Sequence, residues 1–333
     1  MKNSLDLLTI GDSSIDLFMK IDESFVSDIT TGEEEAKGEE PEICFFHGSK
    51  VPVDSFETSI AGNACNVAVG ATKLGMKTSI YTELGDDPNG DRIIKELQKM
   101  GVDTSYCIKN SGTPTNVHAI ITYAGDRTIF SYHEKRKYKL YGWPKPKWIF
   151  YSSLAEGFDE FQEELLAYLE KNPDIGVSFN PGTQQLREGV DALRSILKVV
   201  DVLFVNKEEA QRLTDHDEED VEKLHKKLRV LGPKLTVITL GNKGSTAHDG
   251  QKMVTKDIYK KGENVVDKTG AGDSYATGFV AALHYKKPLE VAMDWGSINS
   301  SHVIRKIGSV KGLLNKKQME NLTAKPKTTE SNN

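Results

Sequence analysis

Short apolar runs rich in β-branched residues alternate along this chain with longer segments whose apolar residues recur every three or four positions. The short runs predict strands, and the amphipathic segments predict helices. Strands are expected at 6–10, 78–82, 148–152, 176–180, 202–205 and 235–240, and helices at about 64–74, 90–100, 158–171, 186–198, 218–231 and from 273 onward. Strands and helices that alternate in this way predict an α/β fold with a mainly parallel sheet flanked by helices.

Two regions depart from this alternation. Residues 115–123 and 127–132 predict two strands of a hairpin with Gly125 in the turn. A further apolar stretch begins at Ile15, and Asp16 interrupts it. A half-buried carboxylate there is costly unless it is paired or bound to something, and the alternative is that Asp16 faces water. We expect a small β-sheet lid from about 15–55 and 113–135, with the side chains of Arg127 and His133 facing solvent.

The rest of the chain predicts one domain that covers residues 1–323 and contains the lid. Residues 22–41 are mostly polar, with acidic runs, and are expected to form a solvated loop. Residues 324–333 lack apolar periodicity, so we expect a disordered tail.

Composition narrows the class of protein. The 333 residues have a formal net charge of −6, which argues against a nucleic-acid-binding protein with a strongly basic surface. No apolar run reaches membrane-spanning length, and the chain begins with a predicted strand rather than a signal peptide. Three scattered cysteines indicate neither a disulfide framework nor a zinc site. We therefore expect a soluble protein of a reducing compartment, the cytoplasm, with no nucleic-acid or membrane partner.

The most informative stretch lies near the C-terminus. Val265 and Val266 predict the end of a strand, Thr269 to Gly272 a tight turn, and Asp273 the opening of a helix. Such a turn gathers free N–H groups and the positive end of a helix dipole into an anion site. An acidic residue there repels an anion, but it is useful as a base that takes a proton from a hydroxyl. The alternative is that Asp273 only caps the helix, and for the turn alone that is the simpler interpretation.

Polar residues also gather at other element ends. Gly62, Asn63 and Asn66 begin the helix of small residues, where amide side chains can bind a polyol. Residues at the carboxyl ends of the predicted strands include Asn180, Asn206 with Glu209, and Thr239 with Gly241. Ligands of open parallel sheets bind at the carboxyl ends of the strands, so the pattern predicts that these residues form one binding edge.

With these residues assembled, the chain resembles the ribokinase-like family of carbohydrate kinases, often called the PfkB family. Residues 267–279 are similar to its second signature, D-x-T-G-A-G-D-[ST]-[FY]-x-x-G-[FY], and residues 61–66 to its first. The resemblance implies a Rossmann-like domain with a β-sheet lid, and transfer of the γ-phosphoryl group of ATP to a hydroxymethyl group. It also implies that Asp273 is the general base and that the N–H groups of Gly270, Ala271 and Gly272 form the anion hole.

The resemblance implies further roles for single residues. Asp16, Gly62, Asn63 and Asn66 would hold the sugar, and Asn206 and Glu209 would orient Mg²⁺ and phosphates through water. The nucleotide would be lined by Thr239, Gly241, Gly244 and Asn299, although another register places Ser297 at the last position. Asp267 and Thr269 match a K⁺ site seen in many members, and a homodimer through the lid is expected.

Other functions remain open at this stage. A sugar kinase is the leading hypothesis, and an adenosine-type nucleoside kinase on the same fold is the alternative. A base clamp in the lid would favour the nucleoside kinase, for which Phe130, Tyr132 and Tyr138 are candidates. A third hypothesis is a binding protein that kept the fold and lost catalysis, but the presence of Asp273 and the neighbouring glycines argues against it. A dinucleotide oxidoreductase is opposed by the absence of G-x-G-x-x-G after the first strand.

Overall fold

The computed structural model describes residues 4–21, 27–28, 43–123, 126–260, 262 and 264–324. The predicted acidic loop at 22–41, apart from residues 27–28, lies outside the described residues. The predicted tail also lies outside them, beyond the end of the last helix at Ala324.

The main sheet has nine strands in the order β15-β14-β13-β12-β11-β10-β1-β6-β7. The seven strands from β13 to β7 pair in parallel, and β14 and β15 add an antiparallel hairpin at one edge. The bounds are β1 (Leu5–Ile10), β6 (Thr78–Gly85), β7 (Asp103–Asn110), β10 (Pro146–Tyr151), β11 (Gly176–Phe179), β12 (Val202–Asn206), β13 (Leu235–Thr239), β14 (Ser245–His248) and β15 (Met253–Lys256). The predicted α/β class with a mainly parallel sheet is confirmed.

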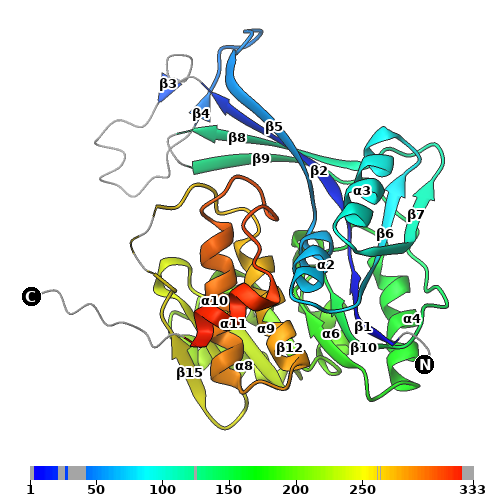
Figure 1. Ribbon diagram of the computed structural model, residues 1–333, viewed down its shortest axis with the longest axis vertical. Helices are drawn as coiled ribbons and strands as arrows, with labels where there is room; N and C mark the ends of the chain where they lie inside the picture. The colour runs from blue at the N-terminus through cyan, green and yellow to red at the C-terminus, as the bar shows by residue number, and fades with distance from the viewer. Residues whose placement is uncertain are drawn as a thin grey trace, which may run out of the picture.

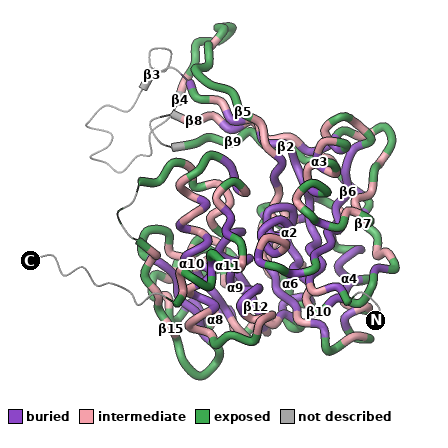
Figure 2. The backbone as a smooth tube through the Cα atoms, in the orientation of Figure 1, coloured by how far each residue is buried: buried purple, intermediate pink, exposed green. Residues whose placement is uncertain are grey.

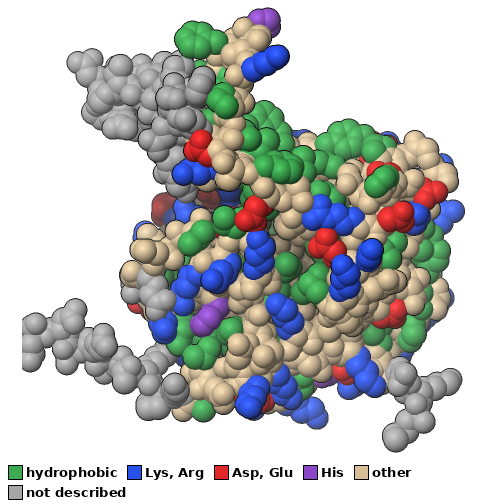
Figure 3. Space-filling model, turned by 45° about the horizontal axis from the view of Figure 1, so that its top comes forward, with side chains coloured by type: hydrophobic (Ala, Val, Ile, Leu, Met, Phe, Trp, Pro, Cys, Tyr) green, Lys and Arg blue, Asp and Glu red, His purple; other side chains and the backbone are tan. Residues whose placement is uncertain are grey.

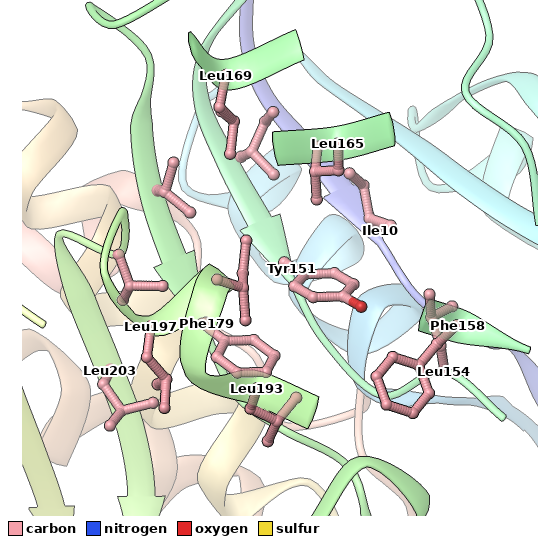
Figure 4. Close-up of a cluster of buried hydrophobic side chains, with 14 of the residues drawn as sticks. Ile10, Tyr151, Leu154, Phe158, Leu165, Leu169, Phe179, Leu193, Leu197 and Leu203 are labelled. Atoms are coloured by element: carbon pink, nitrogen blue, oxygen red, sulfur yellow. The ribbon is translucent and has the colours of Figure 1, made fainter. Parts of the chain in front are cut away.

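Helices cover both faces of this sheet, because adjacent residues of each buried strand point to opposite sides. Leu8 and Leu203 pack on the side of α4 (Phe158–Glu170), α6 (Val190–Leu197), α7 (Lys207–Thr214) and α8 (Val221–Val230), part of which Figure 4 shows. Leu7 and Phe204 pack on the other side, against α2 (Asn63–Lys73), α9 (Ala271–His284), α10 (Leu289–Val303) and α11 (Lys316–Ala324). The result is a three-layer body with a buried central sheet (Figure 2).

The lid is a separate sheet of four strands in the order β5-β2-β8-β9, which stands above the main body in Figure 1. Its strands are β2 (Ser14–Ile21), β5 (Val53–Ala61), β8 (Asn116–Tyr123) and β9 (Asp126–Tyr132). Two short strands, β3 (Ser27–Asp28) and β4 (Ile43–Cys44), pair beside it. The predicted lid is therefore confirmed, and α3 (Pro88–Lys99) packs between β6 and β7 of the body and the lid strands.

Some predicted elements are wrong. The helix expected at 186–198 is two helices, α5 (Thr183–Arg187) and α6, because Gly189 takes a positive φ of 85° between them. The strand expected to end at Val266 is an exposed loop, whose Val266 and Asp267 N–H groups both donate to the Ile304 carbonyl. Strand β7 and helices α10 and α11 were not predicted.

No helix in the described part of the chain is long and apolar enough to cross a membrane. Within the main sheet, β1 lies between β6 and β10, so the strand order reverses direction at β1. The carboxyl ends of β1 and β10 therefore form a topological switch point, which is where open α/β sheets commonly bind ligands.

Candidate active site

The predicted anion turn forms the N-terminus of α9. Gly270 is its N-cap in the left-handed conformation, and a Cβ there would lie 2.5 Å from Ser309 Cβ. Asp273 lies in the first turn and its residue is only 8% exposed. Because Gly270 rather than Asp273 is the N-cap residue, the simple capping interpretation of Asp273 is wrong.

Asp273 is a buried carboxylate held by one side chain. Asn66 Nδ2 donates to Asp273 Oδ2 at 2.8 Å, and Ser309 Oγ donates to Asn66 Oδ1 at 2.6 Å. Burial raises the pKa of Asp273 to about 6; the Asn66 hydrogen bond opposes this shift, and the negative charge of Asp16 adds to it. Asn66, which was expected to hold the sugar, is thus placed to orient the expected base.

A cavity of about 340 Å³ opens beside Asp273, and it brings together most of the predicted catalytic and phosphate-binding residues. A Cβ on Gly272 would meet no other atom within 4 Å, so this glycine borders open space rather than a packed neighbour. The positive side chains Arg127 and Lys268 face the same cavity. The remaining lining residues include Asn63, Asn180, Asn206, Glu209, Thr239, Gly270 and Ala271.

Asn206 and Glu209 form a reciprocal capping box at the start of α7. The Glu209 N–H donates to Asn206 Oδ1 at 2.8 Å, and the Asn206 N–H donates to Glu209 Oε2 at 2.9 Å. Burial raises the pKa of Glu209, and the nearby Asp273 charge raises it further. A carboxylate whose charged form is disfavoured by burial and by a neighbouring carboxylate fits a hydrated Mg²⁺ held by few protein ligands and by phosphates. The described residues contain no group of three or more side chains typical of a dedicated metal site.

A second cavity, of about 270 Å³, adjoins the first beyond Lys268 and Gly272. Its lining is largely apolar, with Ile258, Val265 and Ile304 among the contributors, and Thr239, Gly241 and Gly244 also line it. An apolar slot with a few polar groups suits a flat aromatic ring.

Asn299 does not line this cavity, so its assignment to the nucleotide site is corrected. Asn299 is fully buried; its Nδ2 donates to the Ser274 carbonyl, and its Oδ1 accepts from the Leu314 N–H. Its amide thus joins α9 and α10 to the segment before α11. Ser297, the residue in the alternative register, faces the cavity.

The Asp267 carboxylate holds the turn together. Its Oδ1 accepts from the N–H and hydroxyl of Thr269 at 2.9 and 2.7 Å, and its Oδ2 accepts from the Gly308 N–H at 2.8 Å. Arg127 Nη1 lies 3.2 Å from Asp267 Oδ1 and donates to Thr269 Oγ1 at 2.8 Å. Because Arg127 already supplies a positive charge here, K⁺ binding by Asp267 and Thr269 stays a prediction.

Arg127 is the residue whose role the sequence missed most clearly. Arg127 is exposed, as expected, but its side chain also reaches from β9 of the lid to the anion turn of the body, where it donates to Thr269. The contact links positions about 140 residues apart, and a sequence pattern carries no signal for it.

Polar groups cluster on the lid surface that faces the body. Asp16 is buried, and His118 Nδ1 of the neighbouring strand lies 3.1 Å from its Oδ1. Four buried polar atoms nearby lack a hydrogen-bond partner in the described structure, and strand register places their residues beside Ser14 and Asp16: Ser13 Oγ, Ser59 Oγ, Asn116 Nδ2 and His118 Nε2. These atoms are available to hydrogen-bond a ligand or ordered water.

Gly62 and Asn63 lie where α2 leaves the lid. Gly62 has φ 108°, and a Cβ there would lie 2.3 Å from the Asp12 carbonyl oxygen, so its need for glycine is structural. Asn63 Nδ2 donates to Asn180 Oδ1 at 3.2 Å, and both side chains line the cavity beside Asp273. The carboxyl edge of the main sheet, predicted as the binding edge, thus meets the N-terminus of α2, which was predicted to hold the sugar.

Comparison with known proteins agrees with this fold, in which a small lid sheet accompanies a mainly parallel sheet flanked by helices. Residues 30–316 match the model of the pfkB family of carbohydrate kinases. The chain belongs to this family, and it is a kinase of the carbohydrate or nucleoside class with an alcohol group as acceptor.

Individual relatives differ in their acceptors. The chain is 23% identical to an ATP-dependent 6-phosphofructokinase of Thermoanaerobacterium thermosaccharolyticum, over 79% of this chain and 84% of the relative. It is 26% identical to a nucleoside kinase of Methanothermobacter thermautotrophicus, over 93% and 92% of the two chains. Its structure is similar to that of Arabidopsis thaliana ribokinase complexed with ribose and ATP, with a TM-score of 0.75, 20% identity and coverage of 97% and 100%.

Proposed function

We propose that this protein transfers the γ-phosphoryl group of ATP to a hydroxymethyl group of a small carbohydrate, with Asp273 as the general base. One observation carries the proposal. A buried carboxylate with a raised pKa stands in the first turn of α9, next to the backbone N–H groups that open this helix and beside an open cavity. A base beside an anion site is suited to an alcohol that loses its proton while a phosphoryl group is transferred.

The residues around Asp273 divide the work. Asn66 holds the carboxylate in place, and Asp273 accepts the proton of the acceptor hydroxyl. The N–H groups of Gly270, Ala271 and Gly272 would stabilise the charge of the transferred group, and that of Ala271 also donates to the Lys268 carbonyl at 3.2 Å. Arg127 and Lys268 face the same cavity and add positive charge. Mg²⁺ would neutralise phosphate charge, and Asn206 and Glu209 would hold it through its water ligands.

The nucleotide is proposed to lie across the two adjoining cavities. Its phosphates would occupy the cavity beside Asp273, and its adenine ring the apolar cavity lined by Ile258 and Ile304. Thr239 borders both cavities, and Gly241 and Gly244 line the apolar one. The Arabidopsis ribokinase complexed with ribose and ATP, whose fold is similar, supports ATP as the donor.

The lid favours a sugar over a nucleoside as the acceptor. Phe130 and Tyr132 pair with Ala119 and Val117 of β8, on the lid face opposite to that of Asp16 and His118, and both are exposed. Tyr138 is buried, and its hydroxyl donates to Asp12. None of the three candidates for a base clamp is therefore free beneath the lid, whereas the unpartnered polar atoms beside Asp16 match the hydroxyls of a polyol.

Replacing Asp273 by Asn tests the proposal. The variant keeps the Asn66 hydrogen bond but loses the base, so we expect turnover to fall by about 10²- to 10⁴-fold while nucleotide binding persists. In the unmodified enzyme, kcat/KM is expected to fall about tenfold per pH unit below about pH 6, because protonation removes the base. Turnover of the variant near that of the unmodified enzyme would refute the assignment.

A further inference from the structure

A third cavity, of about 410 Å³, lies at the carboxyl edge of the main sheet beneath the lid. Its floor is the segment that follows β10, from Ser153 to Glu156, beside the topological switch point at β1. Ser131 and Lys135 reach it from the lid side, and Thr183 and Arg187 from α5. None of its lining residues borders the cavity beside Asp273.

The two cavities follow one another along the same edge. Asn180, just after β11, lines the cavity beside Asp273, and Thr183, three residues further on, lines the third cavity. Strand β9 of the lid also borders both cavities, since Arg127 faces the cavity beside Asp273 and Ser131 faces the third cavity. A substrate with one end at Asp273 therefore has the third cavity as the next space along the sheet edge.

The lining of the third cavity is rich in hydrogen-bond donors and carries an excess of positive charge. Its two cations are Lys135 and Arg187, and its single carboxylate is Glu156, which pairs with Lys135 at 2.5 Å. Arg187 is exposed and has no hydrogen-bond or ion-pair partner among the described residues. The hydroxyls of Ser131, Ser153 and Thr183 add donors that a negatively charged oxygen group accepts.

We propose that the acceptor substrate carries an anionic oxygen group, a carboxylate or a phosphate ester, at the end remote from the phosphorylated hydroxymethyl group, and that Arg187 binds it together with Lys135. Arg187 supplies the uncompensated charge and a planar pair of donors that fits either group. Lys135 contributes less, because Glu156 already balances its charge. His133 faces the cavity as a neutral donor or acceptor, since burial and the nearby His118 lower its pKa. This inference rests on the proposed kinase function and specifies its substrate class.

A panel of acceptors in a coupled assay of ADP release tests the inference. The panel pairs neutral sugars with sugar acids and sugar monophosphates of matched carbon skeleton, each with a free hydroxymethyl group, and adds nucleosides. We expect kcat/KM for one of the two anionic classes to exceed that for its neutral counterpart by about tenfold or more, because one charge-assisted contact is gained. The sugar acids and the sugar phosphates distinguish the two sources of the anionic group.

Two variants of the cationic residues then locate the contact. Arg187→Gln is expected to lower kcat/KM for the preferred anionic acceptor by about 10- to 100-fold, mainly by raising KM, and to leave its neutral counterpart within about twofold. Lys135→Gln is expected to have a smaller effect in the same direction. Arg194→Gln is the matched control, since Arg194 lies on α6 outside the cavity and pairs with Asp191. Arg187 is exposed, so these variants are expected to fold, which thermal unfolding checks.

The outcomes separate this inference from the function on which it rests. If neutral sugars or nucleosides are turned over in an Asp273-dependent way and no anionic acceptor is preferred, the inference is wrong and the proposed function stands. It is also wrong if Arg187→Gln slows anionic and neutral acceptors equally. If no acceptor of any class supports ADP release by the unmodified enzyme, the proposed function itself fails.

Discussion

At the scale of the single residue, Asp273 combines a proposed chemical role with a cost in stability. Its pKa is about 6 in the folded protein and 3.8 in the ordinary reference, because burial disfavours the charged form. Between these values the folded state binds more protons than the unfolded state. The contribution of Asp273 to the free energy of unfolding is therefore most favourable below about pH 4, and it is lost as the pH rises through about 6.

Asp273→Asn is accordingly expected to stabilise the protein at neutral pH while it lowers turnover. The expected gain in the free energy of unfolding is about 1–3 kcal/mol at pH 7.5, and it should shrink toward zero near pH 4. Urea unfolding at several pH values measures it. If the variant is less stable than the parent at pH 7.5, burial of the charged carboxylate does not destabilise the folded protein, contrary to this account.

Arg127 tests whether the lid takes part in the reaction. Arg127→Ala removes a positive charge from the cavity beside Asp273, so we expect kcat to fall by about 10- to 1,000-fold with a smaller change in KM for the sugar. Free guanidinium is expected to restore part of kcat, which a merely structural role would not allow. Arg212→Ala on α7, outside this cavity, is the control. Unchanged kcat in Arg127→Ala would remove Arg127 from the mechanism.

Single residues also show the limits of sequence reasoning. Asp273 and its glycines were predictable, because a strong local motif contains both the turn and the acid. Arg127 and His118 were not, because strand pairing and the position of the lid on the body bring them together with residues distant in the sequence. Asn299 was misassigned because the choice between it and Ser297 depends on which face of α10 meets the cavity.

At the scale of the element, the turn that opens α9 contains two glycines, Gly270 and Gly272, which lie in different surroundings. Gly270 takes a positive φ and has Ser309 against it, whereas Gly272 borders only open space. Gly270 thus contributes to stability, and Gly272 leaves room above the N–H groups. The sequence showed the motif without showing this division.

Alanine substitutions separate the two duties. Gly272→Ala is expected to keep the thermal stability within a few degrees and to weaken ATP use by about tenfold or more, because its Cβ enters the space for phosphate. Gly270→Ala is expected to cost about 1–3 kcal/mol of stability, through backbone strain and the clash with Ser309. Calorimetry and steady-state kinetics on both variants measure this. Equal losses of stability would contradict the distinction.

The order of elements was largely predictable from apolar periodicity, because the central strands are fully buried and their helices amphipathic. Strand β7 was missed because it lies at the edge of the sheet and carries mainly polar residues that face solvent in alternation. Val265 and Val266 suggested a strand, but no neighbouring strand lies there in the described part of the chain, and the pair forms an exposed loop instead.

At the scale of the whole molecule, the lid exposes an apolar outer face. Phe56 of β5 and Phe130 and Tyr132 of β9 are 60%, 57% and 49% exposed, and all three lie on the side opposite to Asp16. Hydrophobic side chains accordingly gather along the lid in Figure 3. An apolar patch of this kind is typical of an interaction surface, so the homodimer through the lid remains our prediction.

The prediction is tested by the mass of the protein in solution. We expect a dimer by analytical ultracentrifugation at micromolar concentration, and we expect Phe130→Lys to give a monomer because it places a charge in the apolar face. Val230→Lys, an exposed apolar residue on α8 away from the lid, is the matched control. A parent protein that is monomeric at all concentrations would exclude the dimer.

The most direct test of the central claim is a crystal structure of the Asp273→Asn variant with ATP, Mg²⁺ and the preferred acceptor. The account predicts that the γ-phosphate lies within about 3 Å of the N–H groups of Gly270 to Gly272, and that the acceptor hydroxyl lies within about 3 Å of the amide side chain that replaces the Asp273 carboxylate. A γ-phosphate bound away from the N-terminus of α9 would contradict the account.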